Sequence, residues 1–91
     1  MNSFLNQKSP IEISKQISNR IKQKRKKLKI SQEQLALKSD VSLGSIKRFE
    51  TQYEISLISL IKIAIALDCE SDFEELFNKK TYSSISEVIN E

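Results

Sequence analysis

The sequence lacks histidine altogether, and its 91 residues include only one glycine, one proline and one cysteine. The absence of histidine excludes a histidine-based catalytic triad or a histidine-ligated metal site. No phosphate-cradling glycine loop is present, so we expect neither an enzyme nor a bound cofactor. The single thiol, Cys69, cannot form an internal disulfide. It favours a cytoplasmic chain in which Cys69 is a small buried hydrophobe.

Long hydrophobic runs are also missing. The most apolar stretch, residues 57–67, is too short to span a bilayer and contains Lys62, and the first ten residues do not resemble a signal peptide. We therefore expect no contact with a membrane. The scarcity of glycine disfavours hairpin turns, and no strict alternation of apolar and polar residues is sustained, so the sequence predicts an all-α fold.

Charge is distributed unevenly along the chain. Residues 1–48 contain twelve lysines and arginines against three acids, whereas residues 49–91 contain three lysines against nine acids. A basic half of this kind is typical of a protein that binds a polyanion. The alternative is that two halves of opposite sign neutralise each other and only keep the chain soluble.

Helix-start signals recur along the sequence. Ser9, Ser31 and Ser71 each stand three residues before a glutamate or glutamine, the spacing of a capping box, and Ser42 and Ser56 are further candidate caps. With the spacing of the apolar residues, they predict helices over residues 10–28, 32–38, 42–50 and 57–67, and a short helix opening at residue 71. The residues expected to face inward are Ile13, Ile17, Ile21 and Leu28 with Arg25 on the same face, then Leu35, Ala36, Val41, Ile46 and Phe49, and finally Phe73, Leu76 and Phe77.

The second and third predicted helices have the outline of a helix-turn-helix. Both are short, both open at a serine, and a turn of about three residues joins them. Ala36 is small where the second helix of the pair must cross closely. The residues left facing outward from residues 42–50 are Leu43, Gly44, Lys47 and Arg48.

At these residues the chain resembles the Xre/Cro-type helix-turn-helix domain of phage repressors and bacterial regulators. The resemblance covers about residues 17–77 and follows the order of a basic first helix, Ser-Gln, Leu-Ala, Val-Ser and then Ile-x-x-Phe-Glu. It departs from the family at Asp40, where glycine is usual, and after Glu50, where a glycine and a proline are missing. The segment "VSLGSIKRFE", with "EISLISLIKIAIALD" and "DFEELF", is similar to a narrower subgroup, the HipB-like antitoxins encoded beside HipA-type kinase toxins.

The resemblance implies a compact five-helix, lambda-repressor-like domain that binds double-stranded DNA as a dimer. We expect a flexible N-terminal arm over residues 1–8, the helix-turn-helix domain over residues 9–78, and a tail or short helix over residues 79–91. The family places the third helix in the major groove of an operator, which for a symmetric dimer is an inverted repeat.

The outward face of residues 42–50 is the predicted base-reading surface. Gly44 brings the backbone close to the base edges, Leu43 can meet a thymine methyl, and Arg48 can bond guanine, with Lys47 on a base or a phosphate. The alternatives are that Gly44 relieves a crowded first turn, that Leu43 packs within the protein or against a partner, and that the two cations form a solvated face. The predicted phosphate contacts are Arg20, Lys24, Arg25, Lys26, Gln32, Ser42, Ser45 and Thr51.

Two further expectations concern structure. The resemblance implies that Arg25 pairs with Glu50, because an unpaired charge on the apolar face of the first helix would be costly. The helix over residues 57–67 is apolar nearly all round, which favours a self-association surface and a homodimer. Its alternative is a central helix wrapped by the others.

The leading hypothesis is therefore a sequence-specific, autoregulatory transcriptional repressor, with the antitoxin of a HipA-type operon as its finer form and a toxin as partner. The alternative is a protein-interaction module, either an antitoxin or an adaptor, whose acidic half binds a basic partner and which has little specific affinity for DNA.

Overall fold

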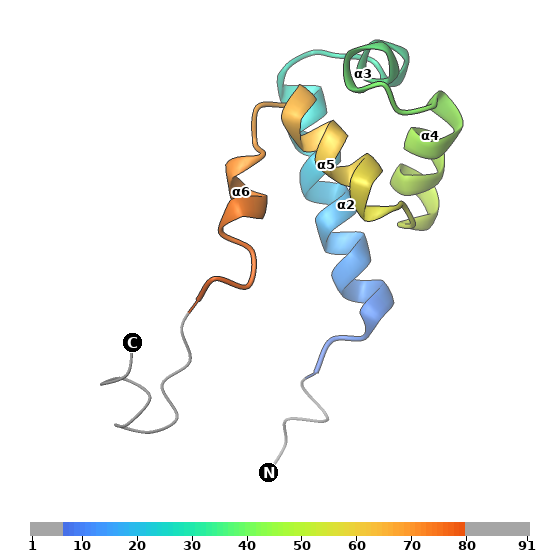
Figure 1. The fold of residues 1–91 in the computed structure, drawn as a ribbon. Helices are drawn as coiled ribbons and strands as arrows, with labels where there is room; N and C mark the ends of the chain where they lie inside the picture. Colours follow the sequence, from blue (N-terminus) through green and yellow to red (C-terminus); the bar gives the residue numbers. More distant parts are fainter. Residues whose placement is uncertain (1–6, 80–91) are drawn as a thin grey trace.

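The computed structural model describes residues 7–79, and the regular secondary structure of this part consists of helices joined by short connections (Figure 1). The expected arm and tail fall largely outside these residues. The helices are α2 (Pro10–Lys27), α3 (Gln32–Ser39), α4 (Leu43–Gln52), α5 (Leu57–Ala66) and the single turn α6 (Ser71–Glu74). Helix α3 packs on both α4 and α5, and α2 packs on α4. The predicted all-α, lambda-repressor-like fold is confirmed.

Four of the five predicted caps are present. Ser9 and Ser31 form complete capping boxes with Glu12 and Gln34, and the side chains of Ser42 and Ser56 accept hydrogen bonds from backbone N–H groups three residues later. The prediction for Ser71 is wrong. The residue before α6 is Glu70, its side chain makes no capping bond, and Ser71 is already the first helical residue.

Helix ends in this chain use left-handed residues other than glycine. Lys29 (φ 59°) ends α2, and Ile30 N–H then bonds to Arg25 C=O at 3.2 Å. Asp68 (φ 60°) ends α5 in the same manner, with Cys69 N–H bonded to Ala64 C=O at 2.8 Å. Both are Schellman motifs, in which glycine is the usual residue.

At both places where the sequence departs from the family pattern, the helix ends at a left-handed residue other than glycine. Asp40 (φ 57°) ends α3 in the left-handed region, where aspartate is tolerated better than most residues. Tyr53 (φ 65°) ends α4, and its N–H bonds to Phe49 C=O at 3.0 Å. The Lys15 ammonium lies 5.9 Å from the centre of the Tyr53 ring, so the end of α4 also contacts α2.

The core lies where α2, α3, α4 and α5 meet. Its members are buried apolar side chains from each of these helices and from the connections that follow them: Ile21, Leu35, Val41, Ile46, Phe49, Ile63, Ala64, Leu67 and Cys69. Ala36 and Phe73 pack against this cluster while remaining partly exposed. The inward face predicted for α3 and α4 is therefore confirmed.

Several residues expected inside are exposed. Ile13, Ile17 and Leu28 have the helical spacing of Ile21 but are exposed, because the buried side of α2 is formed by Ser18, Ile21 and Arg25. Leu76 and Phe77 are exposed as well, Phe77 at 93%, because α6 ends at Glu74 and does not carry them back to the core.

Helix α5 is buried on one side only. Ile63, Ala64 and Leu67 face the core, whereas Leu57, Ile58 and Ile65 are exposed. The alternative of a central helix covered on every side is wrong. Among the described residues, no helix is long and apolar enough to cross a membrane.

Substitutions at Lys29 test whether its left-handed backbone is strained. Any side chain with a Cβ is strained at this position by about 1 kcal/mol, and glycine is not. We expect Lys29→Gly to unfold in urea with a free energy about 1 kcal/mol higher than Lys29→Ala, although glycine is normally the weaker residue. At Gln23, an exposed residue inside α2, the glycine and alanine variants should have the opposite order by about 1 kcal/mol. Equal stabilities at residue 29 would contradict the strain.

Candidate nucleic-acid interface

The outward residues of α4 share one face of the helix. Residues 43, 44, 47 and 48 fall within an arc of about 140°, since each residue turns the helix by about 100°. Gly44, Lys47 and Arg48 are exposed, and Leu43 is half-buried. The structure therefore brings the four predicted base-reading residues to one surface, on which Leu43 is partly exposed.

Gly44 has no internal reason to be glycine. Its φ is not positive, and a Cβ built on it would meet nothing within 4 Å beyond its two neighbours in the chain and the backbone of its own helix. The first turn of α4 is not crowded, so that alternative is wrong. A glycine in a helix costs about 1 kcal/mol relative to alanine. The space beside Gly44 is open to the exterior.

A buried ion pair fixes α4 to α2. Arg25 Nε and Nη2 donate to the two carboxylate oxygens of Glu50 at 2.8 and 3.0 Å, and Arg25 Nη1 donates to Ile30 C=O at 2.7 Å. The side chains are 9% and 3% exposed. All three guanidinium nitrogens are therefore engaged within the protein. This geometry is that of the structural pair expected from the sequence.

Gln32 and Ser18 complete this junction. Gln32 Nε2 donates to Glu50 Oε1 at 2.9 Å, which connects the first turn of α3 to the same carboxylate. Ser18, fully buried in α2, donates to Phe49 C=O at 2.8 Å. Gln32 was predicted to bind phosphate. The structure engages one of its amide hydrogens on Glu50, and the second remains for that role.

The three predicted phosphate-binding hydroxyls differ in their surroundings. Thr51 Oγ1 donates to Lys47 C=O at 2.8 Å, and Ser42 Oγ donates to Ser45 Oγ at 2.7 Å. Ser45 accepts that bond, so its own hydrogen can be donated elsewhere. Of the three hydroxyls, Ser45 is the one best placed to donate to a phosphate oxygen.

The cations of α2 face in different directions. Lys22 lies near enough to Glu50 to lower the pKa of that carboxyl, whereas Lys24 lies near Cys69 and opposes the rise in the pKa of the thiol that burial causes. Arg20 and Lys26 are exposed. Sequence reasoning missed Lys22. Its signal was the three-residue spacing from Arg25, the expected partner of Glu50, since residues three apart lie on the same side of a helix.

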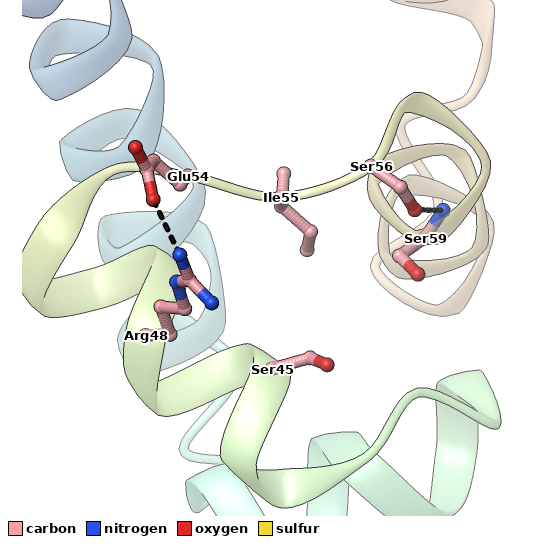
Figure 2. A pocket seen from close by; sticks show the side chains of 6 residues that line it. All are labelled: Ser45, Arg48, Glu54, Ile55, Ser56 and Ser59. Carbon is pink, nitrogen blue, oxygen red and sulfur yellow. Dashed lines mark hydrogen bonds and ion pairs between the residues drawn. The ribbon is translucent and has the colours of Figure 1, made fainter.

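An exposed ion pair was also missed. Arg48 Nη2 donates to Glu54 Oε1 at 2.8 Å, and both side chains are 62% exposed. Figure 2 shows the pair at one side of a hollow between α4 and α5, lined in addition by Ser45, Ile55, Ser56 and Ser59. Glu54 lies beyond the end of α4, so no helical spacing in the sequence indicates the contact.

The buried pair should make stability depend on pH. Burial by itself raises the pKa of Glu50, but the hydrogen bonds from Arg25 and Gln32 and the nearby positive charges outweigh it, and the pKa lies below its ordinary value. A carboxyl whose pKa is lowered by folding stabilises the protein above its unfolded pKa, near 4.5, and this stabilisation is lost as the pH falls through the folded pKa.

We therefore expect Glu50→Gln to lower the free energy of unfolding by about 3 kcal/mol at pH 7, because Arg25 is left buried without its partner. The difference from wild type should shrink as the pH is lowered below 4 in urea titrations. Glu54→Gln, which opens only an exposed pair, should cost less than about 1 kcal/mol at pH 7. A loss for Glu50→Gln no larger than for Glu54→Gln would contradict a stabilising role of the buried pair.

Comparison with known proteins agrees with this geometry. No curated protein and no solved structure matches the chain. A family model described as helix-turn-helix matches residues 21–73, which is more than half of the chain and extends from the middle of α2 into α6. The chain therefore belongs to the Xre/Cro-like helix-turn-helix family of DNA-binding transcriptional regulators.

Proposed function

We propose that this protein is a sequence-specific, autoregulatory transcriptional repressor that places α4 in the major groove of double-stranded DNA. The observation that carries the proposal is the outward face of α4, where an exposed glycine and two exposed cations stand together. A recognition helix presents its N-terminal residues to base edges. Gly44 at that end removes a side chain where the protein itself needs no space.

The roles along this face follow from the chemistry of the groove. Arg48 donates to O6 and N7 of a guanine, Leu43 contacts a thymine methyl, and Lys47 reaches a base or a phosphate. Ser45, Gln32 and the cations of α2 hold the backbone and so fix the position of α4. The ion pair of Arg25 with Glu50 acts by orienting α4, since its atoms are engaged within the protein.

The dimer belongs to the same proposal. Leu57, Ile58 and Ile65 expose apolar surface on α5, and a symmetric pair of copies is the commonest way to cover such a surface. A two-fold dimer would read an inverted repeat whose half-sites lie about one DNA turn, roughly 34 Å, apart.

The finer proposal is an antitoxin that represses its own operon and binds a HipA-type kinase toxin in the cytoplasm. It rests on the resemblance of "VSLGSIKRFE" and the segments after it to that subgroup. Co-expression of the chain with the product of the adjoining gene, followed by purification of either one, tests this step independently of DNA binding.

The alternative function, a protein-interaction module, is favoured by a different observation. Besides the α5 residues, the apolar side chains of Ile11, Ile13 and Leu37 are exposed on α2 and α3. The salt dependence of DNA binding separates the two functions, because neutralising several phosphates makes affinity fall steeply with salt. A module that does not recognise DNA would bind a selected and a scrambled duplex alike at every salt concentration.

Substitution of Gly44 tests the base-reading surface. Gly44→Ala should raise the free energy of unfolding by about 0.5–1 kcal/mol, because alanine is the better helix former and its methyl meets nothing in the chain. The same methyl should weaken binding to a duplex selected from a random pool by about 1–3 kcal/mol, the range for a methyl added at a close-packed contact. If the variant is more stable but binds DNA with unchanged affinity, Gly44 does not lie in the interface.

Substitution of Ile58 tests the dimer surface. Ile58→Lys adds a charge to the exposed face of α5 and should turn a sedimenting dimer into a monomer while the helical circular dichroism is retained. Leu37→Lys, on the exposed side of α3, is the matched control and should leave the dimer intact. A wild-type chain that sediments as a monomer at micromolar concentration would contradict the dimer, as would an Ile58→Lys variant that stays dimeric.

A further inference from the structure

Two serines lie in the interior of the domain, and their hydroxyls are used differently. Ser39 is 6% exposed and donates to Leu35 C=O at 2.7 Å, one turn earlier in α3. Ser18 is fully buried in α2 and donates to Phe49 C=O of α4 at 2.8 Å. The first bond stays within one helix, whereas the second joins α2 to the helix that carries the predicted base-reading surface.

The bond from Ser18 is not required to satisfy the backbone of α4. Phe49 C=O also accepts the N–H of Tyr53 at 3.0 Å, so this carbonyl keeps a partner without Ser18. Serine is a weaker helix former than alanine, and a hydroxyl is costly to bury unless it is bonded. Alanine at residue 18 would occupy less space and leave no polar group without a partner. What serine adds is therefore a directed link between two helices.

This link lies where it can control the tilt of α4. Arg25 and Ser18 are seven residues, or about 10 Å, apart along α2, and both attach to the last turn of α4. Arg25 and Glu50 are long side chains that can shift together, whereas Ser18 has a short side chain and bonds directly to the backbone of α4. Leu43, at the other end of α4, is about 10 Å from this attachment, so a tilt of about 6° would move it by about 1 Å.

We propose that Ser18 is a positioning residue that fixes the crossing angle of α2 and α4, and through it the ability of α4 to discriminate between base sequences. The inference rests on the proposed function of α4, and it requires no contact between DNA and Ser18, whose side chain is fully buried. A hydrogen bond to a base edge requires a distance of about 2.7–3.2 Å, whereas attraction to phosphates acts over roughly 10 Å at moderate salt. A tilt of α4 by a few degrees therefore weakens binding to the correct sequence and leaves binding to an arbitrary duplex almost unchanged.

The test compares Ser18→Ala with Ser39→Ala in the full chain. Each variant loses one buried hydroxyl, and urea titrations should show both to be folded in the binding buffer. The probes are a duplex selected from a random pool by the wild-type protein and its scrambled counterpart at the same salt concentration. Ser18→Ala should weaken binding to the selected duplex by about five-fold, the lower end of the value of one bidentate base contact, and binding to the scrambled duplex by less than about two-fold. Ser39→Ala should leave the ratio of the two affinities unchanged.

Residual dipolar couplings of the backbone N–H groups supply a second measurement, which does not depend on DNA. In Ser18→Ala the couplings of α4 should no longer fit the orientation that α4 has relative to α2 in wild type, and in Ser39→Ala they should still fit it. Ser18→Cys keeps a weak donor and should lie between wild type and Ser18→Ala in both measurements.

An unchanged ratio for Ser18→Ala overturns the inference, as do couplings that show α4 in its wild-type orientation. An equal fall of the ratio in Ser39→Ala also overturns it, because the loss of any buried hydroxyl would then suffice. A wild-type protein that enriches no duplex overturns the proposed function, and the couplings alone then show whether Ser18 orients α4. The two failures are thereby distinguished.

Discussion

The buried pair of Arg25 and Glu50 is the interaction on which the rest of this structure depends. It joins the last turn of α2 to the last turn of α4, and Gln32 joins the start of α3 to the same carboxylate. Three helices thus converge on one charged group in a domain with a small core. A pair this deeply buried is weak evidence for stability in itself, but loss of either partner leaves an uncompensated charge. The pair therefore fixes how α4 is presented, and its geometry excludes arrangements in which α4 rotates its outward face toward α2.

Two ion pairs of opposite character lie on α4. The buried one is bidentate and is completed by Gln32 and Ile30, whereas the exposed one has a single bond and can open at little cost. The first holds the helix, and the second holds one side chain on its outer surface. The backbone of α4 is therefore held firmly, while the guanidinium of Arg48 on its outer surface can exchange its partner at little cost.

Much of this arrangement could be predicted from the sequence because it depends on local spacing. The caps at Ser9, Ser31, Ser42 and Ser56 follow from neighbours three residues away, and the inward face of α3 and α4 follows from helical periodicity. Periodicity does not define which side of an apolar face other elements cover or where that cover ends. Ile17 was wrongly placed inside for the first reason and Phe77 for the second. The contact between Arg48 and Glu54 could not be predicted, because it crosses a connection whose path depends on a left-handed tyrosine.

The central claim, that α4 reads bases through Arg48 in the major groove, can be tested most directly by changing single atoms of the DNA. Each guanine of a selected duplex is replaced in turn by 7-deazaguanine, which lacks the N7 acceptor, and the affinities of wild type and Arg48→Ala are compared. The account predicts one guanine in each half-site at which the replacement weakens wild type by about 1 kcal/mol or more and leaves Arg48→Ala unaffected. If every replacement affects both proteins equally, Arg48 does not read guanine and the account is contradicted.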